Sequence, residues 1–260
     1  MKKYGVALVG CGTVAGYGHL PAIVSSGRAR LVGVVDLIPE KAKSYAERFG
    51  AEHWSTQRSE IIGRDDVDIV VVTTWPSSHA EIVIESLEAG KHVLCEKPMA
   101  RTLGEARAMI EKVKAAGKKL LIGYILRYNV AYQMVKQMID QGDLGRPLVL
   151  NMRGAEGPRT QWAWERDLNL LRDTSPLIDC GCHYVDVMRW YTGAEAVSVS
   201  GVGARLHPDV PEGNYNFASI LVQMGDGSRG IYEVGWGLQM RDFSVKEFMG
   251  PEGFAEIVYE

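Results

Sequence analysis

The first half of the chain alternates short apolar runs with longer segments in which apolar and polar residues recur at helical spacing. The apolar runs are rich in Val, Ile and Leu and show little alternation with polar residues, as expected of strands that are covered on both faces. This succession predicts a parallel sheet that is doubly wound by helices. The predicted strands span residues 4–9, 31–36, 69–74, 92–95 and 119–124.

Local signals mark where the helices between these strands begin and end. Pro39 occupies a first-turn position. S-x-x-E at 78–81 and T-x-x-E at 102–105 both match the capping box, in which a hydroxyl and a carboxylate satisfy backbone N–H groups reciprocally. Gly90 and Gly117 are placed to end helices in the left-handed conformation. These signals support the alternation of strands and helices in this half.

The pattern changes after residue 124, and we place a domain boundary there, with domains at 1–124 and 125–260. The second domain has predicted helices at 128–140 and 177–191. Later β-type segments are joined mostly by turns, and the Asp-Gly pair at 226–227 is a strong hairpin signal. This predicts an α+β domain with an open, largely antiparallel sheet and helices on one face. The β-type segments lie at 197–206, 216–224, 230–236, 243–249 and 255–259.

Composition narrows the class of protein. Of the 260 residues, 46% are apolar and 23% are charged, which is ordinary for globular proteins. The formal net charge is −3 and no run of like charges occurs, which disfavours nucleic-acid binding. No stretch reaches the roughly 18 apolar residues of a membrane span, so no membrane association is expected. Four cysteines are too few for a disulfide framework and suit a reducing compartment, so the cytoplasm is the expected location.

A glycine-rich turn, Gly-Cys-Gly-Thr-Val-Ala at 10–15, follows the first predicted strand and opens a helical pattern. In such a motif Gly10 makes the tight turn, Gly12 lets a pyrophosphate approach the main chain, and Ala15 fills a position where helix and strand pack closely. The N–H groups of the following helix would hold the phosphate charge. We therefore expect a Rossmann-type domain that binds a dinucleotide. A glycine turn in any other doubly wound sheet is the alternative.

Asp36 ends the second predicted strand. In dinucleotide-binding domains an acid about 20 residues after the glycine turn binds the adenosine ribose, and Asp36 lies near that spacing. A carboxylate there also repels a 2′-phosphate, and the next residues, Leu37, Ile38 and Pro39, offer no cation to accept one. The sequence therefore predicts NAD in preference to NADP. The alternative is that Asp36 merely begins a loop.

The sequence Cys-Glu-Lys-Pro at 95–98 follows the strand predicted at 92–95, so Lys97 is expected at the carboxyl edge of the sheet, where ligands of such folds bind. An ammonium group there can polarise a hydroxyl or carbonyl and exchange its proton once its pKa is lowered. An exposed surface lysine is the simpler alternative. The pattern leaves open whether the peptide before Pro98 is cis.

Asp179 and His183 are spaced to share one face of the later predicted helix. We favour an imidazole that is held by the carboxylate and directed at the same pocket as Lys97. A purely structural pair in the core is one alternative. A metal site with Cys180 and Cys182 is another, but the C-x-C spacing and the lack of a second cysteine pair disfavour it, so no metal is expected.

Substrate-binding residues are harder to identify. Aromatic and arginine side chains gather before the helix of Asp179, and aromatic faces with polar donors suit a sugar ring. A solvated loop with one or two packed tryptophans is an equal alternative. These residues are Arg159, Trp162, Trp164, Arg166 and Arg172.

Together these motifs resemble the glucose–fructose oxidoreductase, inositol dehydrogenase and rhizopine catabolism (Gfo/Idh/MocA) family. The resemblance covers essentially the whole chain, and the run Gly-Lys-His-Val-x-x-Glu-Lys-Pro at 90–98 is far more specific than the glycine motif. The other matching parts are the glycine motif at 10–15, Asp36, T-T-W-P-x-x-H at 73–79 and D-x-G-x-H at 179–183.

The resemblance implies NAD(P)-dependent oxidation or reduction of sugars, cyclitols or related alcohols, with Lys97, Asp179 and His183 as catalytic groups. It also implies an open second sheet that commonly pairs subunits, so a homo-oligomer, a dimer or tetramer, is expected. The cofactor-binding candidates are Gly10, Gly12, Thr13, Val14, Asp36, Thr73, Thr74, Pro76, His79, Glu96 and Lys97. The substrate-binding candidates are Tyr124, Arg127, Arg159, Trp162 and Trp164.

The chain departs from the family pattern at three places. Ile125 stands where the family often has Asn two residues before Arg127, so one polar substrate contact is expected to be absent. The glycine-rich segment before the Asp/His helix is replaced by Arg-Asp-Thr-Ser-Pro at 172–176, so the pocket wall is individual. Members usually continue for dozens of residues beyond a point like Glu260, so we expect either a shortened chain or an unusually small second sheet.

The expected reaction is direct hydride transfer between a secondary alcohol carbon and C4 of nicotinamide. In oxidation His183 takes the hydroxyl proton, Asp179 orients the imidazole, and Lys97 hydrogen-bonds the developing alkoxide, and in reduction these roles reverse. Lys97 and His183 remain alternatives for the proton carrier. Two other functions are open: a regulator that senses NAD without turnover, which has no need of all three residues, and an NAD-dependent glycoside hydrolase of the same fold.

Overall fold

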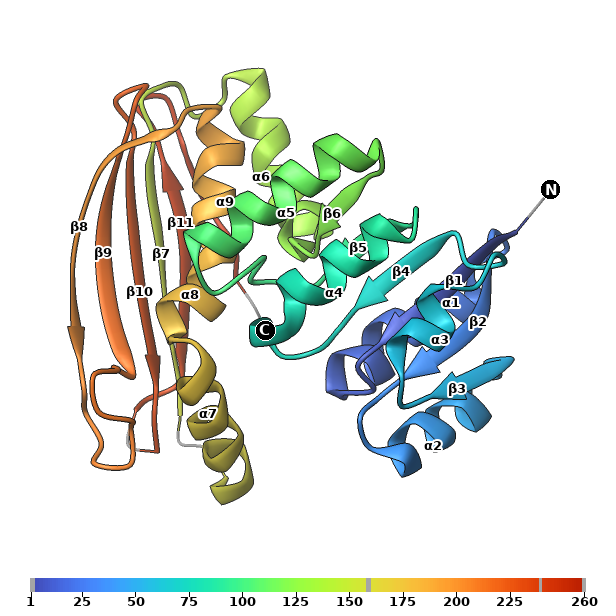
Figure 1. Ribbon diagram of the computed structural model, residues 1–260. Helices are drawn as coiled ribbons and strands as arrows, with labels where there is room; N and C mark the ends of the chain where they lie inside the picture. Colours follow the sequence, from blue (N-terminus) through green and yellow to red (C-terminus); the bar gives the residue numbers. More distant parts are fainter. Residues whose placement is uncertain (1–2, 158–159, 239, 259–260) are drawn as a thin grey trace. The chain divides into compact units, whose positions relative to one another are not determined.

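The computed structural model describes residues 3–157, 160–238 and 240–258. The chain separates into two compact units, Met1–Gly123 and Tyr124–Glu260 (Figure 1). No helix within the described ranges is long and apolar enough to cross a membrane.

The described residues of the first unit form a parallel sheet in the order β3-β2-β1-β4-β5-β6, wound by helices (Figure 1). The doubly wound prediction is confirmed. The strands are β1 (Tyr4–Val9), β2 (Ala29–Val35), β3 (His53–Ser55), β4 (Ile69–Val72), β5 (His92–Cys95) and β6 (Leu120–Ile122). The helices are the π turn η1 (Ala15–His19), α1 (Leu20–Ser25), α2 (Pro39–Phe49), α3 (Arg58–Ile62), α4 (Pro76–Glu88) and α5 (Leu103–Ala116).

Side chains of the central strands enter two cores, because successive residues of a strand point to opposite faces. Ala7 and Val9 of β1 pack in one core with residues of α3, α4 and α5. Val6 and Leu8 pack in the other core with residues of α1 and α2. Both faces of the sheet are therefore covered, which is why the strands lack polar alternation.

Most strand predictions for this unit hold, but the ends differ. The strands predicted at 4–9 and 92–95 are confirmed residue for residue. Those predicted at 31–36, 69–74 and 119–124 exist with shifted or shorter ends. The sequence pattern does not predict β3 and α3, which are too short to display a period of hydrophobic residues.

One of the two predicted capping boxes is confirmed and the other is wrong. Thr102 Oγ1 accepts the N–H of Glu105, whose carboxylate accepts the N–H of Thr102. At 78–81, however, α4 has already begun before Ser78, whose hydroxyl donates to Thr74 Oγ1 at 2.7 Å. A proline in the first turn starts this helix instead of a hydroxyl cap.

The described residues of the second unit form a sheet in the order β12-β11-β7-β10-β9-β8. Its strand pairs are antiparallel except β7–β10, which is parallel. The strands are β7 (Val149–Glu156), β8 (Ala196–Ala204), β9 (Phe217–Met224), β10 (Arg229–Trp236), β11 (Phe243–Met249) and β12 (Phe254–Glu256). The helices are the 3₁₀ turn η2 (Ile125–Tyr128), α6 (Val130–Gln141), α7 (Gln161–Asp173), α8 (Pro176–Asp179) and α9 (Gly181–Thr192).

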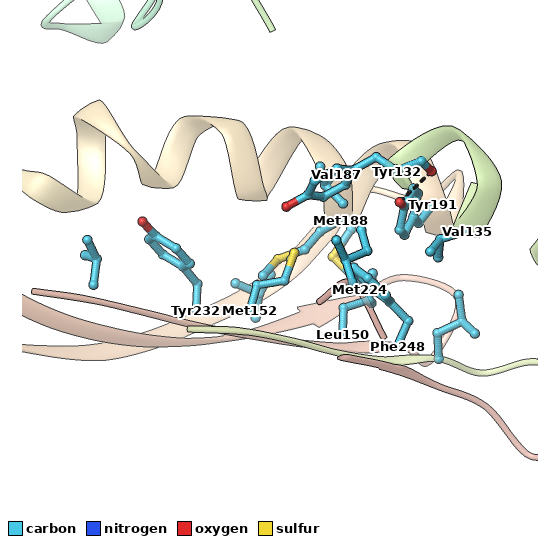
Figure 2. Packing of buried hydrophobic residues seen from close by; sticks show 14 of the residues in the cluster. Tyr132, Val135, Leu150, Met152, Val187, Met188, Tyr191, Met224, Tyr232 and Phe248 are labelled. Carbon is cyan, nitrogen blue, oxygen red and sulfur yellow. Dashed lines mark hydrogen bonds between the residues drawn. The ribbon is translucent and has the colours of Figure 1, made fainter. Parts of the chain in front are cut away.

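The core of this unit lies between the sheet and helices that include α6 and α9 (Figure 2). Val187, Met188 and Tyr191 of α9 face the sheet, and the Tyr191 hydroxyl donates to the Tyr132 carbonyl of α6 at 2.7 Å. The sheet contributes Leu150, Met152, Met224, Tyr232 and Phe248. The prediction of a largely antiparallel sheet with helices on one face is confirmed.

The second unit differs from the sequence-based prediction at three points. The single helix predicted at 177–191 is two helices, because Cys180 separates α8 from α9. β7 and α7 are not predicted, although β7 lies between β10 and β11 in the middle of the sheet. β12 is shorter than the segment predicted at 255–259, whose last residue lies outside the described ranges. The hairpin at 226–227 is confirmed, with Gly227 at φ +91° between antiparallel β9 and β10.

Candidate functional site

The glycine turn after β1 has no space for a side chain at Gly10 but has open space at Gly12. Gly10 has a φ of +102°, and a Cβ there would lie 2.8 Å from the backbone of Thr73 and Thr74. A Cβ on Gly12 would meet nothing beyond its chain neighbours closer than the Thr73 carbonyl oxygen at 4.0 Å. This open position adjoins the first turn of a helix, whose N–H groups have no acceptors within the helix. A pyrophosphate group fits such a turn.

The helix after the glycine turn begins with Thr13 and Val14, both exposed. Ala15 is fully buried, as expected of the third position of the motif. The next turn, Ala15–His19, is π-helical, a rare geometry that is frequent at functional sites. The predicted cofactor-binding residues Thr13 and Val14 therefore lie at an exposed helix start.

Asp36 follows β2 beside the glycine turn. Its Oδ2 accepts the N–H of Cys11 at 2.8 Å, and its Oδ1 accepts the N–H of Ile38 at 2.9 Å. Each carboxylate oxygen can accept a second hydrogen bond. The structure therefore orients a carboxylate that retains capacity for ribose hydroxyls.

The loop after β4 is hydrogen-bonded to the glycine turn. Thr73 Oγ1 donates to the Gly10 carbonyl at 2.7 Å, and Thr74 Oγ1 accepts from Ser78 within α4. Both threonine hydroxyls therefore form hydrogen bonds to other groups of the protein. Contact of either threonine with a cofactor stays a prediction.

Two further candidates from this segment, Pro76 and His79, are buried in α4. His79 Nδ1 lies 2.9 Å from the Pro98 carbonyl oxygen, and His79 Nε2 lies 3.2 Å from the Thr74 carbonyl oxygen. His79 therefore connects the loops after β4 and β5. His79 is fully buried, so its contact with a cofactor stays a prediction.

Glu96 and Lys97 follow β5 at the carboxyl edge of the sheet, as predicted, and the Lys97–Pro98 peptide is cis. Glu96 Oε1 lies 2.7 Å from His19 Nε2, and Glu96 Oε2 accepts the N–H of Lys97 at 3.0 Å. Burial raises the pKa of Glu96, but the hydrogen bonds from His19 and from the Lys97 N–H outweigh it, so this pKa lies below its ordinary value. Glu96 is therefore ionised at neutral pH.

In the second unit, Asp179 ends α8 and His183 lies in the first turn of α9. The Cys180 thiol lies 3.7 Å from Asp179 Oδ2, and the Cys182 thiol lies 3.3 Å from the Asp179 carbonyl oxygen. Both cysteines are free thiols. Within the described ranges, no group of three or more His, Cys, Asp and Glu side chains could hold a metal ion.

Tyr124 meets His183 edge-on, with ring centroids 6.1 Å apart and planes at 75°. Burial, together with nearby Cys182 and Asp186, raises the pKa of Tyr124 to about 12. The Tyr124 hydroxyl is therefore protonated at neutral pH and can donate a hydrogen bond. The structure brings this substrate candidate to the imidazole of the predicted catalytic pair.

The other substrate candidates have different surroundings. Arg127 donates to both carboxylate oxygens of Asp186, at 2.7 and 2.8 Å, which engages its guanidinium inside the unit. Trp164 is only 1% exposed and meets the ring of His207, so it belongs to the core. Arg159 and the side chain of Trp162 lie outside the described part of the chain.

The sequence pattern does not identify His19, whose ring contacts Glu96. His19 is 77 residues from Glu96 in the chain. Its one local signal is its place in the helix that follows the glycine motif. That signal does not distinguish a buried partner of a carboxylate from a surface histidine.

Comparisons with known proteins cover nearly the whole chain. Residues 4–124 match the model of an oxidoreductase family with an NAD-binding Rossmann fold, and residues 132–256 match that of the GFO/IDH/MocA C-terminal domain. The scyllo-inositol 2-dehydrogenase (NAD(+)) of Bacillus subtilis (strain 168) is 32% identical over 232 residues, which are 87% of this chain. The match covers 66% of that relative, so the chain spans just under two thirds of its length.

Solved structures show the same fold. The scyllo-inositol dehydrogenase from Lactobacillus casei with bound NAD(H) and scyllo-inositol has a TM-score of 0.88 at 22% identity, over 98% of this chain and 76% of that one. The WlbA dehydrogenase from Chromobacterium violaceum in complex with NADH and UDP-GlcNAcA has a TM-score of 0.88 at 26% identity, over 98% of this chain and 74% of that one. Because family models match both halves of the sequence, the chain belongs to the GFO/IDH/MocA family of oxidoreductases.

Proposed function

We propose that the protein is an NAD-dependent dehydrogenase that transfers a hydride between the nicotinamide cofactor and a secondary alcohol or ketone of a cyclitol, sugar or related polyol. The observation that carries the proposal is the open position over Gly12 beside the oriented carboxylate of Asp36, at the sheet edge where Lys97 follows β5. The name of the Bacillus subtilis relative supports scyllo-inositol as the first substrate to test. The sugar acid bound to the WlbA dehydrogenase supports adding uronic acids to the panel.

NAD is the proposed cofactor in preference to NADP. The turn at Gly12 would hold the pyrophosphate, and Asp36 would accept hydrogen bonds from the ribose hydroxyls. When bound, the cofactor supplies the nicotinamide ring that accepts or donates the hydride. The carboxylate of Asp36 repels a 2′-phosphate, and the next residue, Leu37, is exposed and uncharged.

The proposed catalytic groups handle the proton and the charge on the substrate oxygen. His183 takes the hydroxyl proton during oxidation and returns it during reduction, and Asp179 orients the imidazole. The Lys97 ammonium donates a hydrogen bond to the same oxygen as negative charge develops on it. Tyr124, edge-on to His183, limits the orientations of the ring.

A homo-oligomer, a dimer or a tetramer, built through the second sheet is proposed as the working assembly. The helices of this unit cover one face of the sheet, and the opposite face exposes apolar side chains from β8, β9, β11 and β12. These are Val202, Leu221, Phe243 and Phe254. Burying such a patch against a second copy would remove apolar surface from water. The cytoplasm is the proposed location, because free thiols suit a reducing compartment.

The reaction class is tested by following the absorbance of reduced nicotinamide while the purified protein is given NAD or NADP with scyllo-inositol, myo-inositol, aldoses and uronic acids. We expect net reduction of NAD with at least one of these compounds and slower reduction of NADP. Binding of NAD without turnover of any compound would favour a sensor. Release of an aglycone from a glycoside without net cofactor reduction would favour a hydrolase.

The role of Lys97 is tested by Lys97→Ala. We expect kcat, measured at saturating NAD, to fall by about 10² to 10⁴-fold, the range for loss of an acid–base group. Lys114→Ala, at an exposed position of α5, is the matched control and should keep normal turnover. Near-normal kcat in Lys97→Ala with NAD bound would show that the assignment is wrong.

A further inference from the structure

A histidine in the helix after the glycine turn is bonded to the loop that carries Lys97. His19 is the last residue of the π turn Ala15–His19, and its Nε2 lies 2.7 Å from Glu96 Oε1. The two side chains are only 17% and 12% exposed. This contact joins the element proposed to hold the pyrophosphate to the residue that precedes Lys97 in the chain.

The Glu96 carboxylate is held by protein groups at both oxygens. Oε1 meets His19, and Oε2 accepts the backbone N–H of Lys97 at 3.0 Å. A Cβ on Gly123 would lie 3.1 Å from Oε1, so the absence of a side chain there makes room for the carboxylate. The main chain at Glu96 is held as well, since the Glu96 N–H donates to the Val72 carbonyl at 2.9 Å.

The charge state of Glu96 fixes the role of its partner. A carboxylate can only accept hydrogen bonds, so His19 must carry a hydrogen on Nε2 and donate it. Both the neutral Nε2–H tautomer and the imidazolium meet this requirement. Without that donor, a poorly solvated carboxylate would lose a charge-assisted hydrogen bond, and reorientation toward water is the direct way to replace it.

Reorientation of Glu96 would release the N–H of Lys97. We infer that His19 is a positioning residue for Lys97: it holds the Glu96 carboxylate, which in turn holds the Lys97 backbone in the conformation that presents the ammonium at the sheet edge. This inference rests on the proposed function, in which that ammonium meets the substrate oxygen. A displacement of about 1 Å in a reacting group can cost up to roughly 10²-fold in rate, so a side chain that never touches the substrate can still control turnover.

The inference is tested first without activity, by measuring hydrogen exchange of the Lys97 amide by NMR in the wild type and in His19→Ala and His19→Gln. His19→Ala should exchange this amide at least about fivefold faster, because its acceptor has moved. His19→Gln should restore slow exchange, since the glutamine amide can donate to Glu96. His53→Ala, which removes a histidine of the same unit on β3, is the control and should leave this amide unchanged. An unchanged exchange rate in His19→Ala would overturn the inference whatever the reaction is.

The second test uses turnover of a substrate identified in the panel. His19→Ala should lower kcat by about tenfold or more with NAD affinity within about twofold of the wild type, and His19→Gln should recover most of the loss. The double variant His19→Ala/Glu96→Gln should be no slower than Glu96→Gln alone, because His19 acts through Glu96. The inference would be overturned if the loss of kcat in the double variant equalled the product of the two single losses. It would also be overturned if His19→Ala bound NAD more weakly but kept a normal kcat. A wild type that reduces NAD with no compound would refute the proposed function and leave the exchange test to decide this inference.

Discussion

Backbone N–H groups orient two carboxylates at the candidate cofactor site. Asp36 accepts them from Cys11 and Ile38, and Glu96 accepts one from Lys97. Neither Asp36 bond involves a cation, so these bonds set the direction of the carboxylate without cancelling its negative charge. That charge is what should separate NAD from NADP, since the 2′-phosphate of NADP would lie beside it.

Asp36→Asn isolates the effect of this charge, because asparagine keeps one oxygen that can accept a backbone hydrogen bond. We expect the ratio of kcat/KM for NADP to that for NAD to rise about tenfold or more, which corresponds to about 1.4 kcal/mol of removed repulsion. Initial rates with both cofactors at saturating substrate measure it.

Asp65→Asn is the control for this variant, since Asp65 is exposed and its substitution should leave the ratio unchanged. If Asp36→Asn also leaves the ratio unchanged, cofactor choice does not depend on this carboxylate.

Several helices begin at a side chain that accepts backbone N–H groups of the first turn. Thr102, Asn129 and Ser175 each accept N–H groups in the first turn of the helix that follows. Ser175 starts the short helix that ends at Asp179, so local capping helps to place a predicted catalytic residue. The break at Cys180 then lets α9 begin anew with His183 in its first turn.

The capping box of α5 gives a prediction for stability. Thr102→Ala removes the acceptor for the Glu105 N–H and should lower the free energy of unfolding by about 1 kcal/mol. Thr102→Ser keeps a hydroxyl and should recover most of this loss. Urea unfolding followed by circular dichroism measures both.

Ser44→Ala is the control, because Ser44 is exposed in the middle of α2 and caps no helix. This substitution should change the free energy of unfolding by no more than about 0.5 kcal/mol. An equal loss in Ser44→Ala and Thr102→Ala would mean that the cap adds nothing.

At the scale of the whole molecule, each unit has its own core. The first unit covers both faces of its sheet with helices, whereas the second covers one face and leaves apolar residues on the other. Leu221 on β9 illustrates this, because its strand neighbour Val222 is buried while Leu221 is 48% exposed. An uncovered sheet face of this kind is the surface through which we expect copies of the chain to associate.

Leu221→Lys places a charge on this face and should weaken self-association, because an ammonium would have to be desolvated on assembly. Size-exclusion chromatography with light scattering should show an oligomer for the wild type and a smaller species for the variant. Leu103→Lys, an equally drastic change at an exposed position of α5, should keep the wild-type mass. A monomeric wild type, or an unchanged mass for Leu221→Lys, would contradict assembly through this sheet.

The fold is predictable from the sequence where a short stretch carries its own signal. The strand at 4–9 is a continuous apolar run with a glycine turn behind it, and the hairpin at 226–227 has a dedicated Asp-Gly pair. β7 has a weaker signal. Its buried residues Leu150 and Met152 alternate with polar residues, but the strands on either side of it, β10 and β11, come from distant parts of the sequence. Its central place and its parallel pairing with β10 follow from the assembly of the sheet.

The candidate site divides in the same way. The sequence by itself determines the glycine turn, the acid after β2 and the position of Lys97 at a strand end, because each depends on backbone conformation or on residues close together in the chain. Only the tertiary structure decides that His19 meets Glu96 and that Arg127 is engaged by Asp186. These partners are 77 and 59 residues apart, and the free energy of a hydrogen-bonded polar pair depends on burial and geometry that no local pattern encodes.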